Sequence, residues 1–279
     1  MIGIKKNKRG FSLIELMVAM AVASILMTLI YGMYVSQVKS HTNQKLIVEM
    51  QQNVRLAMNF LERTIRMAGY DSAGTANAAI MLNFKSFGPP HDDLDIKTDA
   101  THIAFTVDFD GNGAIDLNGD ELLAYRLDNS KLEVWKEDPE SGNWRWMVLA
   151  ENIEAVGFAF AFDDDDPPDG RLDDVGGNVI WAYDSDNNED EDLDKQMDTN
   201  GDGRIDTADD PAGVALASPV KFSSIRAVRI WLLGRTRAPV RGHTDDKTYK
   251  VGKDIISGDG DGFKRHLLIS TVQCRNLGL

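Results

Sequence analysis

The sequence predicts an α+β protein in which one long N-terminal helix is followed by a head of antiparallel strands with long acidic loops. Three observations lead to this prediction. An apolar segment at residues 11–35 continues as a periodic apolar pattern to Ala68, and eight later segments alternate as strands do. Asp, Asn and Gly gather in the turns between those segments. A length of 279 residues suits one membrane-tethered domain.

Residues 11–35 are the most apolar part of the chain. The only charged side chain among them is Glu15, and at a rise of about 1.5 Å per residue a helix of this length can cross roughly 30 Å of hydrocarbon. A short basic leader precedes the segment and contains Lys5, Lys6, Lys8 and Arg9. These charges predict an N-terminus on the cytoplasmic side of the membrane and a head on the other side.

The leader differs from a secretory signal, because no A-x-A-like site closes the apolar segment. The small residue Gly10 lies before the segment instead, so cleavage after Gly10 would keep the apolar helix in the product. Glu15 is then a carboxylate in hydrocarbon, where charge is costly unless it finds a partner, and this makes it a candidate functional residue. The alternative is a carboxylate that reaches the membrane interface.

The residues GFSLIE at positions 10–15, followed by a long apolar helix, resemble the processing motif of type IV prepilins and type II secretion pseudopilins. The resemblance implies that a prepilin peptidase cleaves after Gly10 and that Phe11 is then N-methylated. It also implies that Glu15 attracts the free amine of a neighbouring subunit during assembly. Other major and minor pilins are the partners implied for this helix.

The helical pattern continues through residues 36–69 as an amphipathic helix. Apolar residues recur there mostly at spacings of three and four, at Val38, Leu46, Met50, Val54, Met58, Leu61, Ile65 and Ala68. Gly69 is a candidate C-cap, so the helix is expected to run from about Phe11 to Ala68, over roughly 85 Å.

Residues 53–71, NVRLAMNFLERTIRMAGYD, resemble the end of the long helix in PilW-type minor pilins. The segments SSIRAVRIWLLGRTRAP and FKRHLLISTVQCRNLGL resemble the closing strands of the same family. The resemblance is strong at both ends of the chain and weak from about Tyr70 to Pro219. It implies a pilin-like fold in which residues 1–10 are a cleaved leader and residues 70–279 form the globular head.

Eight segments of the head are predicted as strands, because β-branched or aromatic residues alternate in them. They are residues 102–107, 122–127, 131–136, 144–149, 153–162, 179–183, 225–233 and 267–274. Trp135, Trp144 and Trp146 flank a DPESGN turn and are expected in one hairpin. Packing is their expected role, and an exposed adhesive surface is the alternative.

The chain is strongly acidic, with a formal charge of −14. Loss of the leader removes four positive charges, which gives −18 and argues against a general nucleic-acid binder. The surplus is concentrated in residues 163–210, where 19 Asp or Glu face three basic residues. That insertion is either a solvated loop or a cation site.

The sequence MDTNGDGRIDTADD matches the template of calcium-binding loops, with Gly203 at the turn and Ile205 directed to the core. The ligand positions fall on Asp198, Asn200, Asp202, Arg204 through its carbonyl, Asp206 and Asp209. These hard oxygens suit calcium, and closure by Asp instead of Glu predicts a dissociation constant of roughly 10⁻⁴ to 10⁻³ M. The alternative is a simple Asp-Gly turn.

A second, less regular copy lies at residues 108–121. It offers Asp108, Asp110, Asn112 and Asp116, and because Gly119 stands at position 12, closure falls to Asp120 or Glu121. A third pattern, at residues 165–173, has Pro167 where a ligand belongs and is predicted as a solvated turn. Residues 184–194 lack both the glycine and the apolar position and are predicted as a flexible loop.

No catalytic constellation is visible, so an enzyme is not expected. The five histidines lack zinc-ligand spacing, and no glycine-rich phosphate loop is present. Cys274 has no partner for a disulfide and is expected to be a small core residue.

These features and the family resemblance predict a minor pilin that takes part in initiating type IV pilus assembly or forms the tip complex. It is expected in the inner membrane before assembly and on the pilus or cell surface afterwards. One alternative is a J-type minor pseudopilin of type II secretion, which shares the architecture. Another is a tip adhesin or DNA-uptake receptor, whose basic strip could consist of Arg226, Arg229, Arg235, Arg237 and Arg241, although salt bridges explain these arginines more simply.

Overall fold

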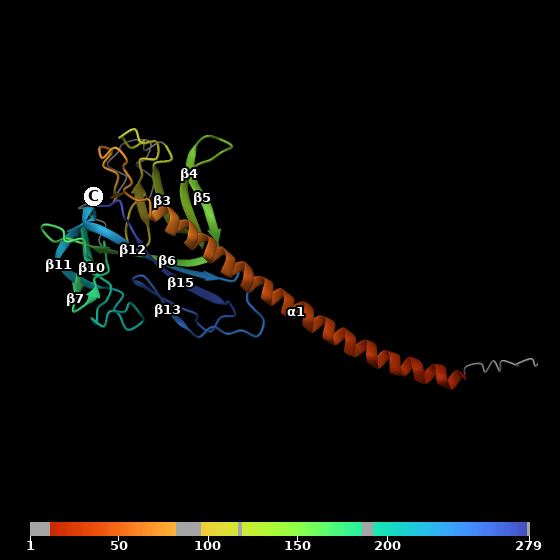
Figure 1. The fold of residues 1–279 in the computed structure, drawn as a ribbon. Coiled ribbons are helices and arrows are strands. Elements are labelled where there is room, and N and C mark those ends of the chain that lie inside the picture. The colour runs from red at the N-terminus through yellow and green to blue at the C-terminus, as the bar shows by residue number, and fades with distance from the viewer. Residues whose placement is uncertain (1–11, 82–95, 117–118, 186–191, 278–279) are drawn as a thin grey trace, which may run out of the picture. The chain divides into compact units, whose positions relative to one another are not determined.

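The computed structural model describes residues 12–81, 96–116, 119–185 and 192–277. These residues form one long helix, α1 (Leu13–Ile65), and four antiparallel sheets, which confirms the predicted α+β fold class (Figure 1). The chain divides into two compact units, residues 1–46 and residues 47–279. Gly10 and Phe11 lie outside the described residues, so the cleavage position stays a prediction.

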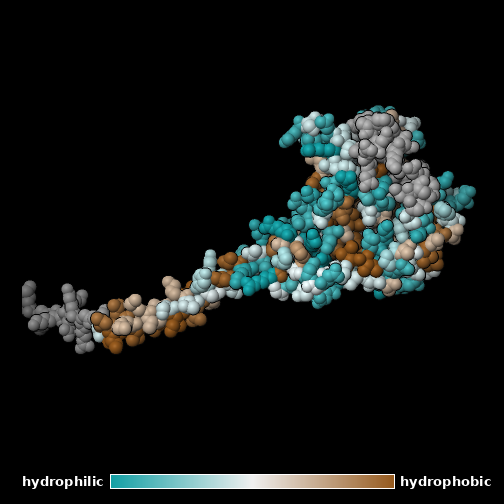
Figure 2. Space-filling model, turned by 180° about the vertical axis from the view of Figure 1, so that it is seen from behind, coloured by the Kyte–Doolittle hydropathy of each residue, from teal (hydrophilic) through white to brown (hydrophobic). Residues whose placement is uncertain are grey.

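The first unit contributes the apolar part of α1. Its large apolar side chains are exposed, from Leu13 at 76% to Met33 at 74%, and brown colour runs along this part of the helix in Figure 2. The helix that begins here is long and apolar enough to cross a membrane. An exposed apolar surface of this extent is typical of a segment that contacts lipid or other helices.

The end of α1 is fixed by backbone geometry. The helix ends at Ile65, three residues before the predicted end, and a turn leads to Gly69, whose φ of 74° is the left-handed conformation expected of a C-cap glycine. The Gly69 N–H donates to the carbonyl of Thr106 at 3.1 Å. A Cβ at this glycine would lie 2.3 Å from Cδ2 of Leu277, so the closing segment of the chain also requires glycine here.

The second unit contains two main sheets, in which every neighbouring pair is antiparallel. The first has the order β1–β2–β3–β4–β5, with strands Ile80–Met81, Ile103–Thr106, Leu122–Asp128, Lys131–Glu137 and Trp144–Glu151. The second has the order β11–β10–β9–β6–β12–β15, with strands Val214–Lys221, Asp192–Gln196, Ala182–Tyr183, Ile153–Phe162, Ile225–Arg235 and Arg265–Gln273. Two small hairpins and one 3₁₀ turn complete the set: β7 (Asp174–Val175) with β8 (Asn178–Val179), β13 (Thr248–Val251) with β14 (Asp254–Ser257), and η2 (Phe222–Ser224).

Most predicted strands are confirmed, and one predicted loop is wrong in its last three residues. The segment 179–183 is interrupted, since β8 ends at Val179 and β9 begins at Ala182. Of the predicted flexible loop at 184–194, residues 186–191 lie outside the described residues and residues 192–194 belong to β10. In β10, Leu193 is fully buried and pairs with Val220, so tertiary pairing outweighs the low strand propensity of the flanking aspartates.

One core joins the second half of α1 to both main sheets. The predicted apolar face is buried at Met50, Val54, Met58, Leu61, Ile65 and Ala68, whereas Val38 in the first unit is 46% exposed. Phe105 of β2 and Phe158 of β6 belong to the same core cluster. Full burial of each large apolar side chain contributes about 1.5–3 kcal/mol relative to its exposure. The amphipathic pattern therefore identifies the helix face on which the head is built.

The tryptophans of β4 and β5 and the single cysteine serve packing. Trp135 is 4% exposed and meets Trp146 edge-on at 5.6 Å, in register across the two strands, as predicted for one hairpin. Cys274 is buried, and its Sγ donates to the Ile65 carbonyl at 3.7 Å. Burial raises the pKa of the Cys274 thiol to about 12, which fits a core residue and not a nucleophile.

Replacement of Gly234 by alanine should destabilise the head. A Cβ at this position of β12 would lie 2.1 Å from Cγ2 of Val54, which is fully buried on α1. We expect a loss of about 1–3 kcal/mol in the free energy of unfolding, measured by denaturant titration of the full chain in detergent with tryptophan fluorescence. Gly32→Ala is the control, because no atom lies within 4 Å of its added Cβ. Equal unfolding midpoints for the two variants would contradict this close contact.

Candidate cation-binding loops

Three acidic loops begin at or just after the end of a strand. The first acidic loop (residues 108–121) connects β2 to β3, the second (residues 163–173) follows β6, and the third (residues 198–209) follows β10. Residues 117 and 118 of the first loop lie outside the described residues. The three loops share three hydrogen bonds, although their lengths differ.

In the first shared bond, the leading aspartate of each loop accepts the backbone N–H of a later glycine. The three glycines have φ values of 79°, 78° and 81°, a left-handed conformation that favours glycine. The pairs are Gly113 to Asp108 at 3.2 Å, Gly170 to Asp163 at 2.9 Å and Gly203 to Asp198 at 2.8 Å. This bond bends the loop around the leading carboxylate.

The second shared bond orients the side chain just before that glycine. The residue after the glycine donates its N–H to this Asp or Asn at 2.8 Å in each loop. The pairs are Ala114 to Asn112, Arg171 to Asp169 and Arg204 to Asp202. Each of these side chains therefore has one oxygen fixed by the backbone.

The third shared bond closes each loop. A carboxylate from the end of the loop accepts the N–H of the second loop residue, which joins the two ends. The pairs are Phe109 to Glu121 at 2.9 Å, Asp164 to Asp173 at 3.2 Å and Thr199 to Asp209 at 2.8 Å. Of the two residues considered for closure of the first loop, Glu121 makes this bond and is 5% exposed, whereas Asp120 is exposed.

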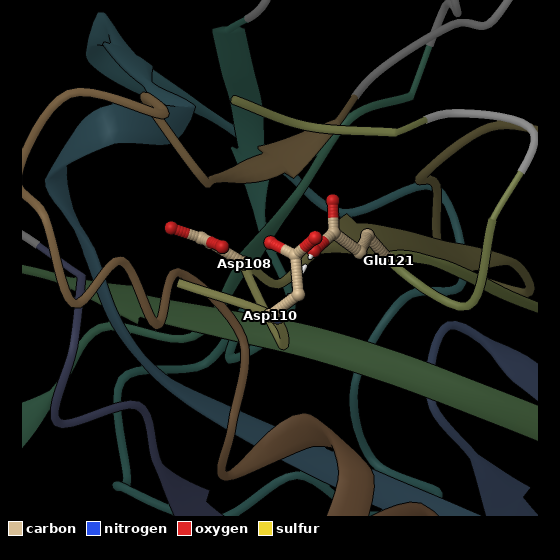
Figure 3. A group of neighbouring side chains, drawn as sticks. All are labelled: Asp108, Asp110 and Glu121. Carbon is tan, nitrogen blue, oxygen red and sulfur yellow. Dashed lines mark hydrogen bonds between the residues drawn. The ribbon is translucent and has the colours of Figure 1, made fainter. Parts of the chain in front are cut away.

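The carboxylates converge in two of the three loops. One oxygen from each of Asp108, Asp110 and Glu121 lies within 4.8 Å of the others, and Figure 3 shows the three side chains next to one another. Asp116, also predicted as a ligand, donates its backbone N–H to Glu121 at 2.6 Å. Such a group of hard oxygens can hold a metal ion.

The third loop, which matches the template best, contains no such group of three converging carboxylates among its residues, all of which are described. Its template ligands include Asn200, whose Oδ1 accepts the Asp202 N–H at 2.9 Å. Asp206 donates its N–H to Asp209, as Asp116 does to Glu121. The backbone of the third loop thus follows the first loop, but its carboxylates are more widely spread.

The second loop, predicted as a solvated turn, is the other converging group. Oxygens of Asp163, Asp165 and Asp173 lie within 4.8 Å of one another. Burial and the neighbouring carboxylates of Asp164 and Asp165 raise the pKa of Asp173 to about 6. The sequence prediction starts this loop at Asp165 and does not include Asp163. Two features of the sequence could have indicated Asp163: it directly follows a predicted strand, and an Asp-Gly pair comes later in the loop.

Lys250 was also not anticipated from the sequence. Its side chain is 5% exposed, and Nζ donates to the backbone carbonyl of Asp209 at 3.2 Å. Burial lowers the pKa of Lys250, which the nearby aspartates partly offset. Lys250 therefore ties the closing residue of the third loop to β13.

The arginines considered as a basic strip are largely engaged within the head. Their groups and distances are Arg226 to the Ser223 carbonyl at 2.8 Å, Arg229 over the Trp181 ring at 4.0 Å, Arg235 to Glu154 at 3.6 Å and Arg237 to Glu49 at 3.5 Å. Arg241 also has an interaction. Two of these four contacts, those of Arg235 and Arg237, are the salt bridges that the simpler explanation predicts. Arg226 instead binds a backbone carbonyl and Arg229 stacks on a ring, so all four are engaged within the head but only two by ion pairs.

Glu15 lies in the first turn of α1, where its Oε2 accepts the backbone N–H of Ser12 at 3.0 Å. This bond has the form of a capping box, in which the third helical residue reaches back to the residue before the helix. It satisfies one backbone N–H at the helix start, and the Glu15 carboxylate can still accept a hydrogen bond from a further partner.

Family models match most of the chain. Residues 5–31 match the prokaryotic N-terminal methylation motif, residues 43–166 match prepilin peptidase-dependent protein B, and residues 126–276 match type IV pilus-assembly protein W. No curated protein matches significantly. Among solved structures, a type IV-like pilin from Thermus thermophilus is similar, with a TM-score of 0.42 and 17% identity over 82% of this chain and 98% of that chain.

Replacement of Glu121 by alanine should destabilise the head even without metal. The change removes the carboxylate of the buried Glu121, which accepts the N–H groups of Phe109 and Asp116, and the loss of hydrogen bonds to a carboxylate costs about 1–3 kcal/mol. Urea unfolding of the full chain in detergent and excess chelator measures this loss. Asp120→Ala is the matched control, since Asp120 is exposed. An unfolding free energy unchanged by Glu121→Ala would show that these bonds do not hold the loop.

Proposed function

Because the chain belongs to the family of type IV pilus-assembly protein W and carries the N-terminal methylation motif, we propose that it is a minor pilin that helps to initiate pilus assembly or forms the tip complex. The observation that carries the proposal is the apolar half of α1, whose large apolar side chains are exposed and whose one charged side chain within residues 11–35 is Glu15. Such a helix is suited to leave a bilayer and pack among identical or related helices.

In this proposal the leader directs processing and orientation. A prepilin peptidase cleaves after Gly10, and Phe11 becomes the methylated first residue. The basic leader holds the N-terminus on the cytoplasmic side of the inner membrane and places the head in the periplasm. After assembly the head is exposed on the pilus or cell surface, and the role of the chain is structural, not enzymatic.

The large head supports a subunit of low copy number. The head has two main sheets and long acidic insertions, which are difficult to repeat at every position of a densely packed shaft. A subunit that initiates assembly or stands at the tip is not repeated along the shaft, so its head can be larger.

Calcium is the proposed ligand of the first and third acidic loops. The first loop would use Asp108, Asp110, Asn112, Asp116 and Glu121, and the third Asp198, Asn200, Asp202, the Arg204 carbonyl, Asp206 and Asp209. Support comes from the shared backbone bonds and from the converging oxygens of the first loop. All donors are oxygens, which calcium prefers, and their net negative charge would be neutralised by the ion.

A J-type minor pseudopilin of type II secretion is the main alternative. Deletion of the gene separates the two functions: the proposal expects loss of surface filaments with normal export of folded enzymes. The opposite result, intact filaments with export abolished, would favour the pseudopilin.

A DNA receptor is supported less, because the candidate arginines are engaged within the head. Salt-dependent retention of DNA by the full chain, lost on replacement of Arg237 and Arg241, would favour it. No retention at low salt would exclude it.

Replacement of Glu15 by alanine should prevent efficient assembly. The variant loses the only carboxylate in the apolar segment, so it should accumulate in the inner membrane and fall at least about tenfold in sheared filaments relative to wild type, which corresponds to about 1.4 kcal/mol. Immunoblots of the two fractions measure this ratio. Glu151→Ala, at an exposed position of the head, is the control. Normal entry of the Glu15 variant into filaments would refute its assembly role.

Calcium should raise the melting temperature of the full chain in detergent. With an ion about tenfold above its dissociation constant, linkage predicts about 1.4 kcal/mol, or roughly 3–6 °C for a head of this size. Asp198→Asn should reduce the shift, whereas Asp210→Asn, just outside the template and exposed, should not. An identical melting temperature in 2 mM calcium chloride and in chelator would contradict both sites; ~2 mM is above the affinity range expected of extracellular loops.

A further inference from the structure

The second acidic loop contains a buried carboxylate, that of Asp163, which a simple solvated turn would expose to water. Asp163 directly follows β6, its N–H donates to the Ser224 carbonyl at 3.0 Å, and the residue is 1% exposed. An aspartate is rarely buried to this degree without groups that compensate its charge. The backbone of β6 and the segment before β12 hold this residue in place.

One oxygen of Asp163 has a partner and the other does not. Oδ2 accepts the Gly170 N–H at 2.9 Å. Oδ1 is buried and accepts no hydrogen bond from any described residue. A buried acceptor without a partner is unfavourable, and it indicates a missing ion or another group.

The surroundings supply much more negative than positive charge. Oxygens of Asp165 and Asp173 lie within 4.8 Å of one oxygen of Asp163. An open pocket of about 460 Å³ adjoins them, and its lining includes Asp164, Asp165, Asp169, Asp173 and Asp174. The only basic residue in this lining is Arg171. Three carboxylates this close repel one another unless a cation or proton lies between them.

We propose that Asp163, Asp165 and Asp173 form a third cation site, which takes a hard divalent ion of the calcium type. The donors are carboxylate oxygens without nitrogen or sulfur, which disfavours zinc and copper. Asp163 supplies the buried ligand, Asp173 links the ion to the end of the loop, and the exposed Asp165 faces the pocket, where water can complete the coordination of calcium. This site depends on neither the pilus assignment nor the other two loops.

Counting bound ions tests the site directly. Equilibrium dialysis of the full chain in detergent against ⁴⁵CaCl₂, up to about 1 mM to cover weak extracellular-type sites, gives the number of ions per chain. Asp165→Asn should lower that number by one relative to wild type. Asp165 is exposed, so the variant should still fold.

Asp174→Asn is the matched control. It removes the same charge from the same pocket, lies outside the converging group, and keeps the Oδ1 that accepts the Gly177 N–H. The control should bind as many ions as wild type. Asp163→Asn should lose one ion, and if it fails to fold, the comparison of Asp165→Asn with Asp174→Asn decides. Equal ion counts for Asp165→Asn and wild type, or equal losses in both variants, would overturn the proposal.

Discussion

The packing of the buried face of α1 against the central strands is the contact on which the head depends. At Gly234 the backbone of β12 approaches Val54 so closely that a single methyl group does not fit. The same helix face meets residues of both main sheets, and Tyr125 of β3 donates to Thr64 Oγ1 at 2.9 Å. Just beyond the helix, the Gly69 N–H donates to the carbonyl of Thr106 in β2, and the Leu277 side chain packs against Gly69. Beginning, middle and end of the head are therefore assembled on one helix face.

The acidic loops are compact because the sheets hold the start of each loop in place. Each leading aspartate lies within two residues of a strand end, and a glycine and a closing carboxylate fold the loop around it. Because these carboxylates accept backbone N–H groups, they hold the loop backbone in place without any ion. Their negative charges are not neutralised by these bonds, and this is clearest at the buried Asp163, whose Oδ1 has no hydrogen-bond partner among the described residues. We propose that calcium supplies the balancing positive charge.

Features with local causes could be predicted from the sequence. The periodic face of α1, the glycine at its end and the strands from β2 to β6 depend on spacing and propensity. Features set by tertiary contacts could not: β10 forms because its neighbours bury Leu193, and Lys250 approaches Asp209 across 41 residues. In the loops, the template located Asp108 and Asp198, but only the fold distinguished Glu121 from Asp120 and brought Asp163 to Asp165 and Asp173.

We propose that the exposed helix carries this acidic head into a type IV pilus as a subunit of low copy number. Quantitative mass spectrometry of sheared and purified filaments tests it most directly, with the chain measured against the most abundant filament subunit. We expect the chain to be present, to begin at a methylated Phe11, and to occur at a small fraction of the abundant subunit. Its absence from filaments, or an amount equal to that subunit, would refute this role.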